Sequence, residues 1–197
     1  MSGKKPELRK AVTEYAAGYA GRLEEFLTQL PFKEIARAVE LMTEARDAGR
    51  TIFTFGNGGA AATASHLACD LGKGASIGRE RRFRVLSLAE NRSWATALAN
   101  DISYDAVFVE ELRNFLEPHD VCIALSASGK SRNVLEAARF ARSAGASVVG
   151  ISGYGGGELA EVSDVPIVLP GDHMGLVEDL QMVACHIMAY YFMEKCT

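Results

Sequence analysis

Two short segments of the 197-residue chain carry residue types that can hold a ligand, and the serine-rich one suits a phosphate group. Residues 126–131, Ser-Ala-Ser-Gly-Lys-Ser, offer three hydroxyls and several backbone N–H groups just before a predicted helix. The N-terminus of a helix carries a partial positive charge, so hydroxyls and N–H groups placed there favour an anion. We therefore predict a phosphate site at Ser126, Ser128 and Ser131, with the Ser131 side chain also capping the helix.

The second segment is rich in glycine. Residues 55–60, Phe-Gly-Asn-Gly-Gly-Ala, follow a predicted strand. Gly58 and Gly59 allow a ligand to approach the backbone closely, although the same glycines can equally serve only the turn from strand to helix. The segment lacks the Lys-Ser or Lys-Thr of a Walker loop, and its glycine spacing differs from the dinucleotide fingerprint. A nucleotide cofactor is therefore disfavoured.

Histidines and acids on two predicted helices have the chemistry to move a proton or to bind a metal. His66 and Asp70 are four residues apart, so they share one face of a helix. Glu178 lies near the start of the last predicted helix and His186 lies well inside it. Structural roles remain open for all of them, because a histidine on an apolar helix is more often a core residue, and His66 with Asp70 is also compatible with a surface pair.

The elements that must position these residues are short apolar strands alternating with helices. The predicted strands are residues 51–55, 83–88, 121–125, 147–151 and 165–169, and the predicted helices between and after them are residues 60–71, 93–100, 105–116, 131–144, 158–162 and 176–194. The strands are rich in Val, Ile, Leu and Phe and do not alternate with polar residues, as expected of parallel strands covered on both faces. The pattern predicts an α/β fold, a three-layer doubly wound sandwich with a mostly parallel five-stranded sheet. Ligands bind such sheets beyond the carboxyl ends of the strands.

A helical extension precedes this core. Residues 1–49 are predicted to form two helices and residues 50–197 the α/β core, all in one domain. The first helix repeats apolar residues at steps of three and four, namely Leu8, Val12, Tyr15, Tyr19, Leu23, Phe26 and Leu30. Such a stripe is longer than one domain surface requires, and it indicates association with other subunits.

The composition excludes several classes of protein. The chain has 21 Lys and Arg against 25 Asp and Glu, a formal net charge of −4, which argues against a broad nucleic-acid or membrane surface. It contains no apolar run long enough for a transmembrane helix. The four cysteines form no Cys-x-x-Cys pair, so we expect no disulfide framework and a protein of the reducing cytoplasm. We expect the cysteines themselves to be small buried apolar side chains. They are Cys69, Cys122, Cys185 and Cys196.

The loops and histidines together resemble the sugar isomerase (SIS) domain family, and within it the chain is similar to the phosphoheptose isomerases over nearly its whole length. The features that carry the resemblance are residues 56–59, His66, residues 100–101, residues 126–131 and His186. The resemblance implies a flavodoxin-like SIS fold and a homotetramer with active sites at subunit interfaces. It also implies an aldose–ketose isomerase that converts sedoheptulose 7-phosphate to D-glycero-D-manno-heptose 7-phosphate.

The resemblance also implies roles for individual residues. His186 matches the family's catalytic histidine, and Asp70 stands where the family has a catalytic glutamate. Together with His66 and Glu178 they match positions that bind one zinc ion per subunit in some members. The implied substrate-binding residues are Asn57, Gly58, Gly59, Asn100, Asp101, Ser126, Ala127, Ser128, Ser131 and Glu178. Of these, Asn100 and Asp101 are expected to come from a neighbouring subunit.

Four positions depart from the family pattern. Ala60 replaces a serine, Thr63 an aspartate, Asp70 a glutamate and Glu178 a glutamine. The alternative interpretation is a non-catalytic SIS-domain protein that senses a sugar phosphate or binds a replication initiator as a tetrameric scaffold. The presence of both Asp70 and His186 favours the enzyme, because a binding module needs no carboxylate and imidazole facing the sugar.

Overall fold

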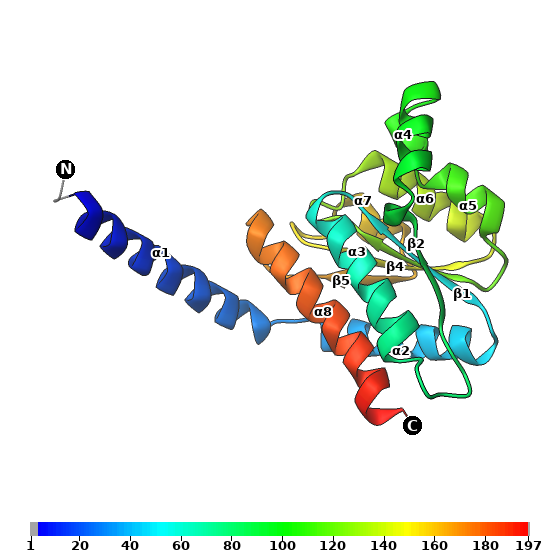
Figure 1. Cartoon of the computed structure of the whole chain (residues 1–197), viewed down its shortest axis with the longest axis horizontal. Helices are drawn as coiled ribbons and strands as arrows, with labels where there is room; N and C mark the ends of the chain where they lie inside the picture. Colours follow the sequence, from blue (N-terminus) through cyan, green and yellow to red (C-terminus); the bar gives the residue numbers. More distant parts are fainter. Residues whose placement is uncertain (1–3, 197) are drawn as a thin grey trace. The chain divides into compact units, whose positions relative to one another are not determined.

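The computed structural model describes residues 4–196 (Figure 1). The chain divides into two compact units, Met1–Leu30 and Pro31–Thr197. The first contains helix α1 (Lys4–Leu27), on which Leu8, Val12 and Tyr15 of the predicted stripe are exposed, whereas Leu23 and Phe26 are partly buried. The single domain stays a prediction, and its outer boundaries lie outside the described residues.

The sheet of the second unit fixes where a ligand binds. In the part of the chain that the structure describes, it consists of β1 (Thr51–Gly56), β2 (Arg84–Ser87), β3 (Val121–Leu125), β4 (Ser147–Ser152) and β5 (Val165–Val168). The order is β2-β1-β3-β4-β5 and every pairing is parallel, which confirms the predicted doubly wound sheet. The chain reverses its direction of winding between β1 and β3, and ligands bind such sheets at this switch point.

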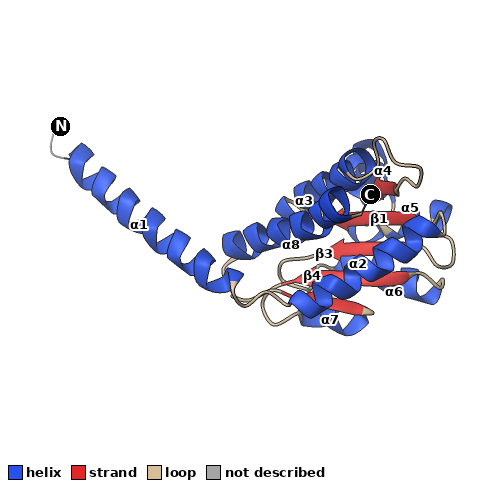
Figure 2. Cartoon of the chain, turned by 90° about the horizontal axis from the view of Figure 1, so that it is seen from below, coloured by secondary structure: helices blue, strands red, loops and turns tan. Residues whose placement is uncertain are grey.

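Helices cover both sides of this sheet (Figure 2). The helices of this unit, within the described residues, are α2 (Phe32–Asp47), α3 (Gly59–Cys69), α4 (Arg92–Asp101), α5 (Val109–Phe115), α6 (Arg132–Ser143), α7 (Gly157–Val162) and α8 (Met174–Lys195). Helices α2 and α3 both pack on α8, whereas α5 and α7 both pack on α6. No helix within residues 4–196 is long and apolar enough to cross a bilayer.

Packing of the helices on the sheet accounts for the burial of the central strands. Strand β3 is buried at every position, because helices cover both of its faces. The prediction that every strand is covered on both faces is wrong for the edge strand β2, in which no residue is buried and Leu86 is 50% exposed.

The helices differ from the prediction at one place. The predicted helix over residues 105–116 is instead a 3₁₀ turn, Tyr104–Ala106, followed by α5. The break turns Phe108 inward, where its ring packs on Phe55 with the ring centroids 5.4 Å apart.

The cysteines differ in part from the prediction. Cys122 and Cys185 are buried, and burial raises the pKa of the Cys185 thiol to about 12, with a smaller contribution from the charge of Asp70. Cys69 is exposed, so the expectation of a buried side chain is wrong there, because the end of α3 leaves this residue facing solvent. All four thiols are free. The reducing cytoplasm stays a prediction.

Candidate functional site

The two predicted loops meet at the carboxyl edge of the sheet. Gly56 at the end of β1 lies opposite Leu125 at the end of β3, so the glycine-rich loop and the serine-rich loop begin side by side. They enclose a cavity of about 140 Å³. Its lining residues are Asn57, Ala60, Leu125, Ser126, Ala127, Ser128, Ser131, Met174 and Glu178. Six of the ten predicted substrate-binding residues are among them.

Hydrogen bonds within the serine-rich loop shape this cavity. The Ser126 side chain is buried, and its hydroxyl donates to Ser131 Oγ across 3.1 Å. The backbone N–H of Lys130 donates to Ser128 Oγ across 3.3 Å. Ser131 occupies the N-cap position of α6, but its side chain makes no capping hydrogen bond, so the predicted capping role is wrong. Its hydroxyl pairs with Ser126 instead, which keeps both groups at the cavity.

Glu178 lies over the glycine-rich loop. A Cβ atom at Gly59 would overlap the Glu178 carboxylate, so glycine lets this side chain rest on the loop without being displaced. Gly59 is the first residue of α3, where the helix dipole favours a negative charge. Glu178 also lines the cavity beside the serine-rich loop (the serine cavity).

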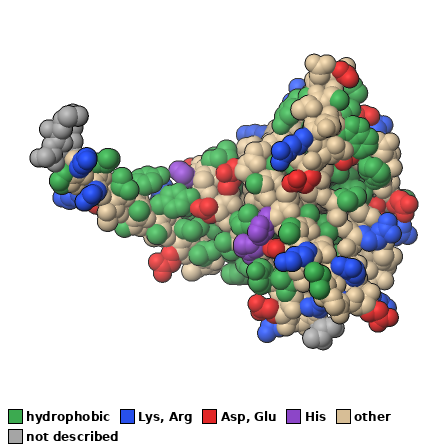
Figure 3. Space-filling model, viewed as in Figure 1, with side chains coloured by type: hydrophobic (Ala, Val, Ile, Leu, Met, Phe, Trp, Pro, Cys, Tyr) green, Lys and Arg blue, Asp and Glu red, His purple; other side chains and the backbone are tan. Residues whose placement is uncertain are grey.

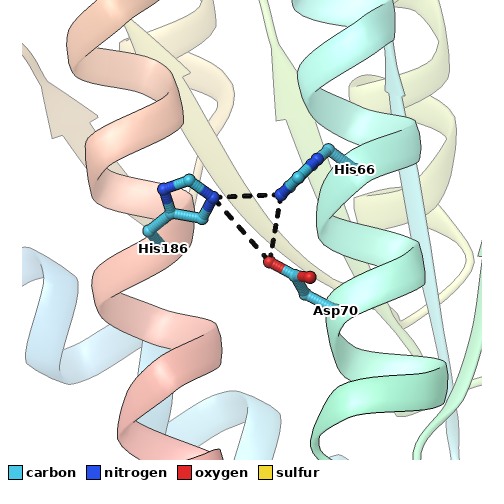
Figure 4. Close-up of side chains that lie close together, drawn as sticks. All are labelled: His66, Asp70 and His186. Carbon is cyan, nitrogen blue, oxygen red and sulfur yellow. Dashed lines mark hydrogen bonds and ion pairs between the residues drawn. The ribbon is translucent and has the colours of Figure 1, made fainter.

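A second group of predicted residues converges between α3 and α8. Helix α3 ends at Cys69 and continues as one π-helical turn, Asp70–Gly74, an irregularity found often at functional sites. His186 Nε2 on α8 lies 3.0 Å from His66 Nε2 and 3.9 Å from Asp70 Oδ2, and His66 Nε2 lies 3.2 Å from Asp70 Oδ2. Figure 4 shows the three side chains pointing toward one another from the two helices.

This cluster is open to solvent on one side. The side chains of His66 and His186 are 46% and 43% exposed, and that of Asp70 is 18% exposed. On the molecular surface, histidine and acidic side chains lie next to each other over α3 and α8 (Figure 3). A small molecule can therefore reach the two imidazole rings, whereas Asp70 Oδ2 itself is buried.

The donor set of the cluster fits a divalent metal ion such as zinc. Ligand atoms about 2.0–2.1 Å from a tetrahedral zinc ion are about 3.3 Å from one another, close to the separations found here. Asp70 Oδ2 is buried, and no described group donates a hydrogen bond to it, although His66 Nε2 lies 3.2 Å away. Three ligand atoms that converge in this way match a cation, which would replace the hydrogen bond between the two imidazole nitrogens. Glu178, the fourth predicted ligand, is not in this group.

The remaining predicted pair lies elsewhere. Asn100 and Asp101 are exposed at the end of α4, and Asn100 Nδ2 donates to Asp101 Oδ1 across 2.8 Å. Neither residue lines the serine cavity of the described chain. Their contact with substrate stays a prediction that requires a second subunit.

The structure also adds two residues that the sequence did not single out. Asn133 and Tyr104 both hydrogen bond to the Asn57 side chain. Asn133 lies two residues after the serine-rich loop, in the first turn of α6. Its residue type was the only sequence signal that it makes a functional hydrogen bond, since asparagine side chains near a helix start often bond to neighbouring groups. No local pattern marks Tyr104.

Comparisons with known proteins give one consistent result. A family model described as "SIS domain" matches residues 14–153. The phosphoheptose isomerase of Rhodospirillum rubrum is 37% identical over 154 residues, which is 78% of this chain and 81% of that protein. The phosphoheptose isomerase of Mycobacterium tuberculosis is 38% identical over 157 residues, covering 79% of this chain and 80% of the other.

A solved structure agrees with the sequence matches. The phosphoheptose isomerase of Neisseria gonorrhoeae superposes with a TM-score of 0.83 at 26% identity, covering 94% of this chain and 98% of that chain. The structural similarity therefore extends over nearly the whole of both chains.

Proposed function

The chain belongs to the SIS-domain family, among sugar-phosphate isomerases of the phosphoheptose isomerase type, and from this premise we propose that it converts sedoheptulose 7-phosphate to D-glycero-D-manno-heptose 7-phosphate. In this proposal the serine cavity holds the phosphate, and the cluster of Asp70 and His186 acts at the carbonyl end of the sugar.

The distance between the serine cavity and the cluster of Asp70 and His186 is the observation that supports a seven-carbon substrate. Helix α8 links them, with Glu178 at the serine cavity and His186 eight residues further on. Eight residues of α-helix rise about 12 Å. An extended seven-carbon chain with its phosphorus has eight bonds and spans roughly 10 Å, by the extended-chain reach of about 3.5 Å for every three bonds. Such a sugar therefore fits between a phosphate at the serines and a reacting carbon at the cluster.

The isomerisation needs a proton to leave the carbon beside a carbonyl and to return to the adjacent carbon. In the proposal, Asp70 or His186 removes the proton from C1 of the ketose, and the other group donates a proton to the carbonyl oxygen, which gives an enediol. Return of a proton to C2 and loss of one from the C1 hydroxyl completes the aldose. The 3.9 Å between His186 Nε2 and Asp70 Oδ2 places both groups within reach of two bonded carbons.

We further propose that His66, Asp70 and His186 bind one zinc ion per subunit, which as a Lewis acid would polarise the carbonyl oxygen. Asp70 and His186 would then transfer protons only where the substrate releases them from the metal. Excess zinc is then expected to raise the Tm by about 5–10 °C, because a ligand at 100 times its Kd adds about 2.7 kcal/mol to the stability of a domain of this size. Thermal melts with and without zinc check this, after chelator treatment. An unchanged Tm would argue against the metal site.

The function itself is tested by incubating the purified protein with sedoheptulose 7-phosphate, with and without zinc, and following the aldose product by NMR. The proposal requires product formation well above a protein-free control. Binding of the sugar phosphate without any product would instead identify the non-catalytic binding protein of the alternative interpretation.

The charge of Glu178 gives a specific prediction about affinity. Its carboxylate shares the serine cavity with the proposed phosphate, and like charges at such separations repel. Glu178→Gln is expected to lower KM for the sugar phosphate by about 3–10-fold, since it removes roughly 1 kcal/mol of repulsion in a solvent-accessible cavity. The matched control is Glu161→Gln on α7, outside this cavity, which should leave KM unchanged. A higher KM in Glu178→Gln would show that the carboxylate binds substrate directly.

We also propose a homotetramer, supported by the exposed apolar residues of α1. Leu8, Val12 and Tyr15 are 64%, 56% and 63% exposed, and apolar stripes of this kind mark association. Light scattering at micromolar concentration is expected to give four times the 21.2 kDa chain mass. A monomeric mass would contradict the proposal and would leave Asn100 and Asp101 without a site to complete.

A further inference from the structure

A pair of side-chain amides connects the two ligand-facing loops. Asn57 Nδ2 donates to Asn133 Oδ1 across 2.8 Å, and Asn133 Nδ2 donates back to Asn57 Oδ1 across 2.9 Å. Asn57 belongs to the glycine-rich loop after β1, and Asn133 lies in the first turn of α6. The reciprocal pair therefore holds this loop at a fixed position beside the serine-rich loop.

A backbone group fixes which way both amides face. The N–H of Val134 donates to Asn133 Oδ1 across 3.0 Å. A backbone N–H can only donate, so the oxygen of Asn133 must face it. The Asn133 Nδ2 group then faces Asn57 and donates, so the Asn57 atom that accepts from it must be Oδ1. The orientation of the Asn57 amide is thus set by the backbone of α6.

Tyr104 completes this arrangement. Its hydroxyl donates to Asn57 Oδ1 across 2.8 Å, so that oxygen accepts two hydrogen bonds and both of its lone pairs are used. One hydrogen remains on Asn57 Nδ2, whose other hydrogen goes to Asn133. Because Asn57 lines the serine cavity, the group it can offer to a ligand there is an N–H donor and not an acceptor.

We propose that Asn133 and Tyr104 are positioning residues, which hold Asn57 as a hydrogen-bond donor to an oxygen atom of the bound sugar phosphate. The inference rests on the proposed function, because that function places the sugar phosphate in this cavity. Asn133 is buried, with 2% of its surface exposed, and so it acts through Asn57 without touching the ligand. A fixed donor avoids the cost of reorienting the amide when the ligand binds.

A double-mutant cycle tests this role. Calorimetric titration with sedoheptulose 7-phosphate is expected to show a Kd about 10-fold higher for Asn57→Ala and a similar increase for Asn133→Ala, the usual effect of losing one hydrogen bond to a polar or charged acceptor. The double variant should bind no more than about twofold more weakly than Asn57→Ala, because residues that act as a unit are not additive. Additive losses would overturn the proposal, since a merely structural Asn133 weakens binding in either background.

Tyr104→Phe provides a second cycle that does not depend on a buried substitution. Tyr104 is 58% exposed, so its variant is expected to fold as the parent does. The Kd should rise about threefold alone and should not change in the Asn57→Ala background. The matched control is Asn114→Ala on α5, whose amide donates only to the backbone oxygen of Glu110 and which should keep the parental Kd.

The cycle and the proposed function fail in different ways. A parent protein that binds the sugar phosphate without isomerising it would refute the enzyme while the cycle still measures the positioning role. Normal turnover with additive losses would refute the positioning role alone. Absence of binding to the parent protein would overturn both.

Discussion

Replacement of His186 by glutamine is expected to lower kcat at least about 100-fold, while KM for the sugar phosphate changes less than about threefold. Glutamine keeps the polarity and approximate size of histidine but cannot exchange a proton near neutral pH. His186 lies on α8 beside Asp70 and away from the serine cavity, so the phosphate contacts should persist. The NMR assay gives kcat and KM, and a thermal melt verifies folding.

Two further histidine variants make this result specific. His119→Asn changes an exposed histidine in the turn before β3, where φ is +72°, a backbone conformation that asparagine tolerates; it should leave kcat unchanged. His66→Gln removes a proposed zinc ligand without removing the proposed acid–base group. It should abolish the stabilisation by zinc, and without added zinc it should retain more activity than His186→Gln. Parental turnover in His186→Gln would show that His186 is not the proton-transfer group.

The second large effect is expected from Gly129→Ala. Gly129 lies in the serine-rich loop with φ of +65°, and an added Cβ would overlap the carbonyl oxygen of Gly156 and lie 2.7 Å from its carbon. Because the colliding atoms are backbone atoms, either the serine-rich loop or the loop that contains Gly156 must move. We expect KM for the sugar phosphate to rise at least about 30-fold, because misplacing a binding group by about 1 Å can cost 100-fold.

Gly155→Ala is the matched control for this prediction. Gly155 has a similar φ of +76°, but an added Cβ there meets no atom within 4 Å. Alanine should therefore cost only the left-handed strain, about 1–2 kcal/mol, which lowers the Tm by roughly 2–8 °C at this chain length. Its KM should match that of the parent. Equal KM values for the two variants would show that the packing of the serine-rich loop does not hold the phosphate groups in place.

The sequence by itself determined the elements and the identity of the two loops. Mostly apolar, non-alternating strands that follow one another through helices indicate a parallel sheet with its central strands buried on both faces, as β1, β3 and β4 are. A parallel sheet places the loops after its strands at one edge, so residues 55–60 and 126–131 had to share that edge. Glycine affects the conformation of its own backbone, and serine bonds to the backbone of the next helical turn. Such short-range effects can be predicted from one segment of sequence.

Tertiary structure alone decided which side chains meet. His66 and His186 are separated by 120 residues, and their 3.0 Å approach depends on how α3 packs on α8. The prediction of four zinc ligands did not anticipate that Glu178 lies over Gly59, because side-chain direction along α8 follows from packing and not from residue type.

The same reason explains the errors in hydrogen bonding. Ser131 is a residue type that caps helices, yet its hydroxyl meets Ser126 across the loop. Asn57, Asn133 and Tyr104 come from three segments, and no periodicity connects them. Local propensities act over about one turn of chain, whereas the partner of a polar side chain is chosen by whichever segment the fold brings within about 3 Å. The sequence therefore determined where the site is, and the packing of α3, α6 and α8 on the sheet decided which atoms act in it.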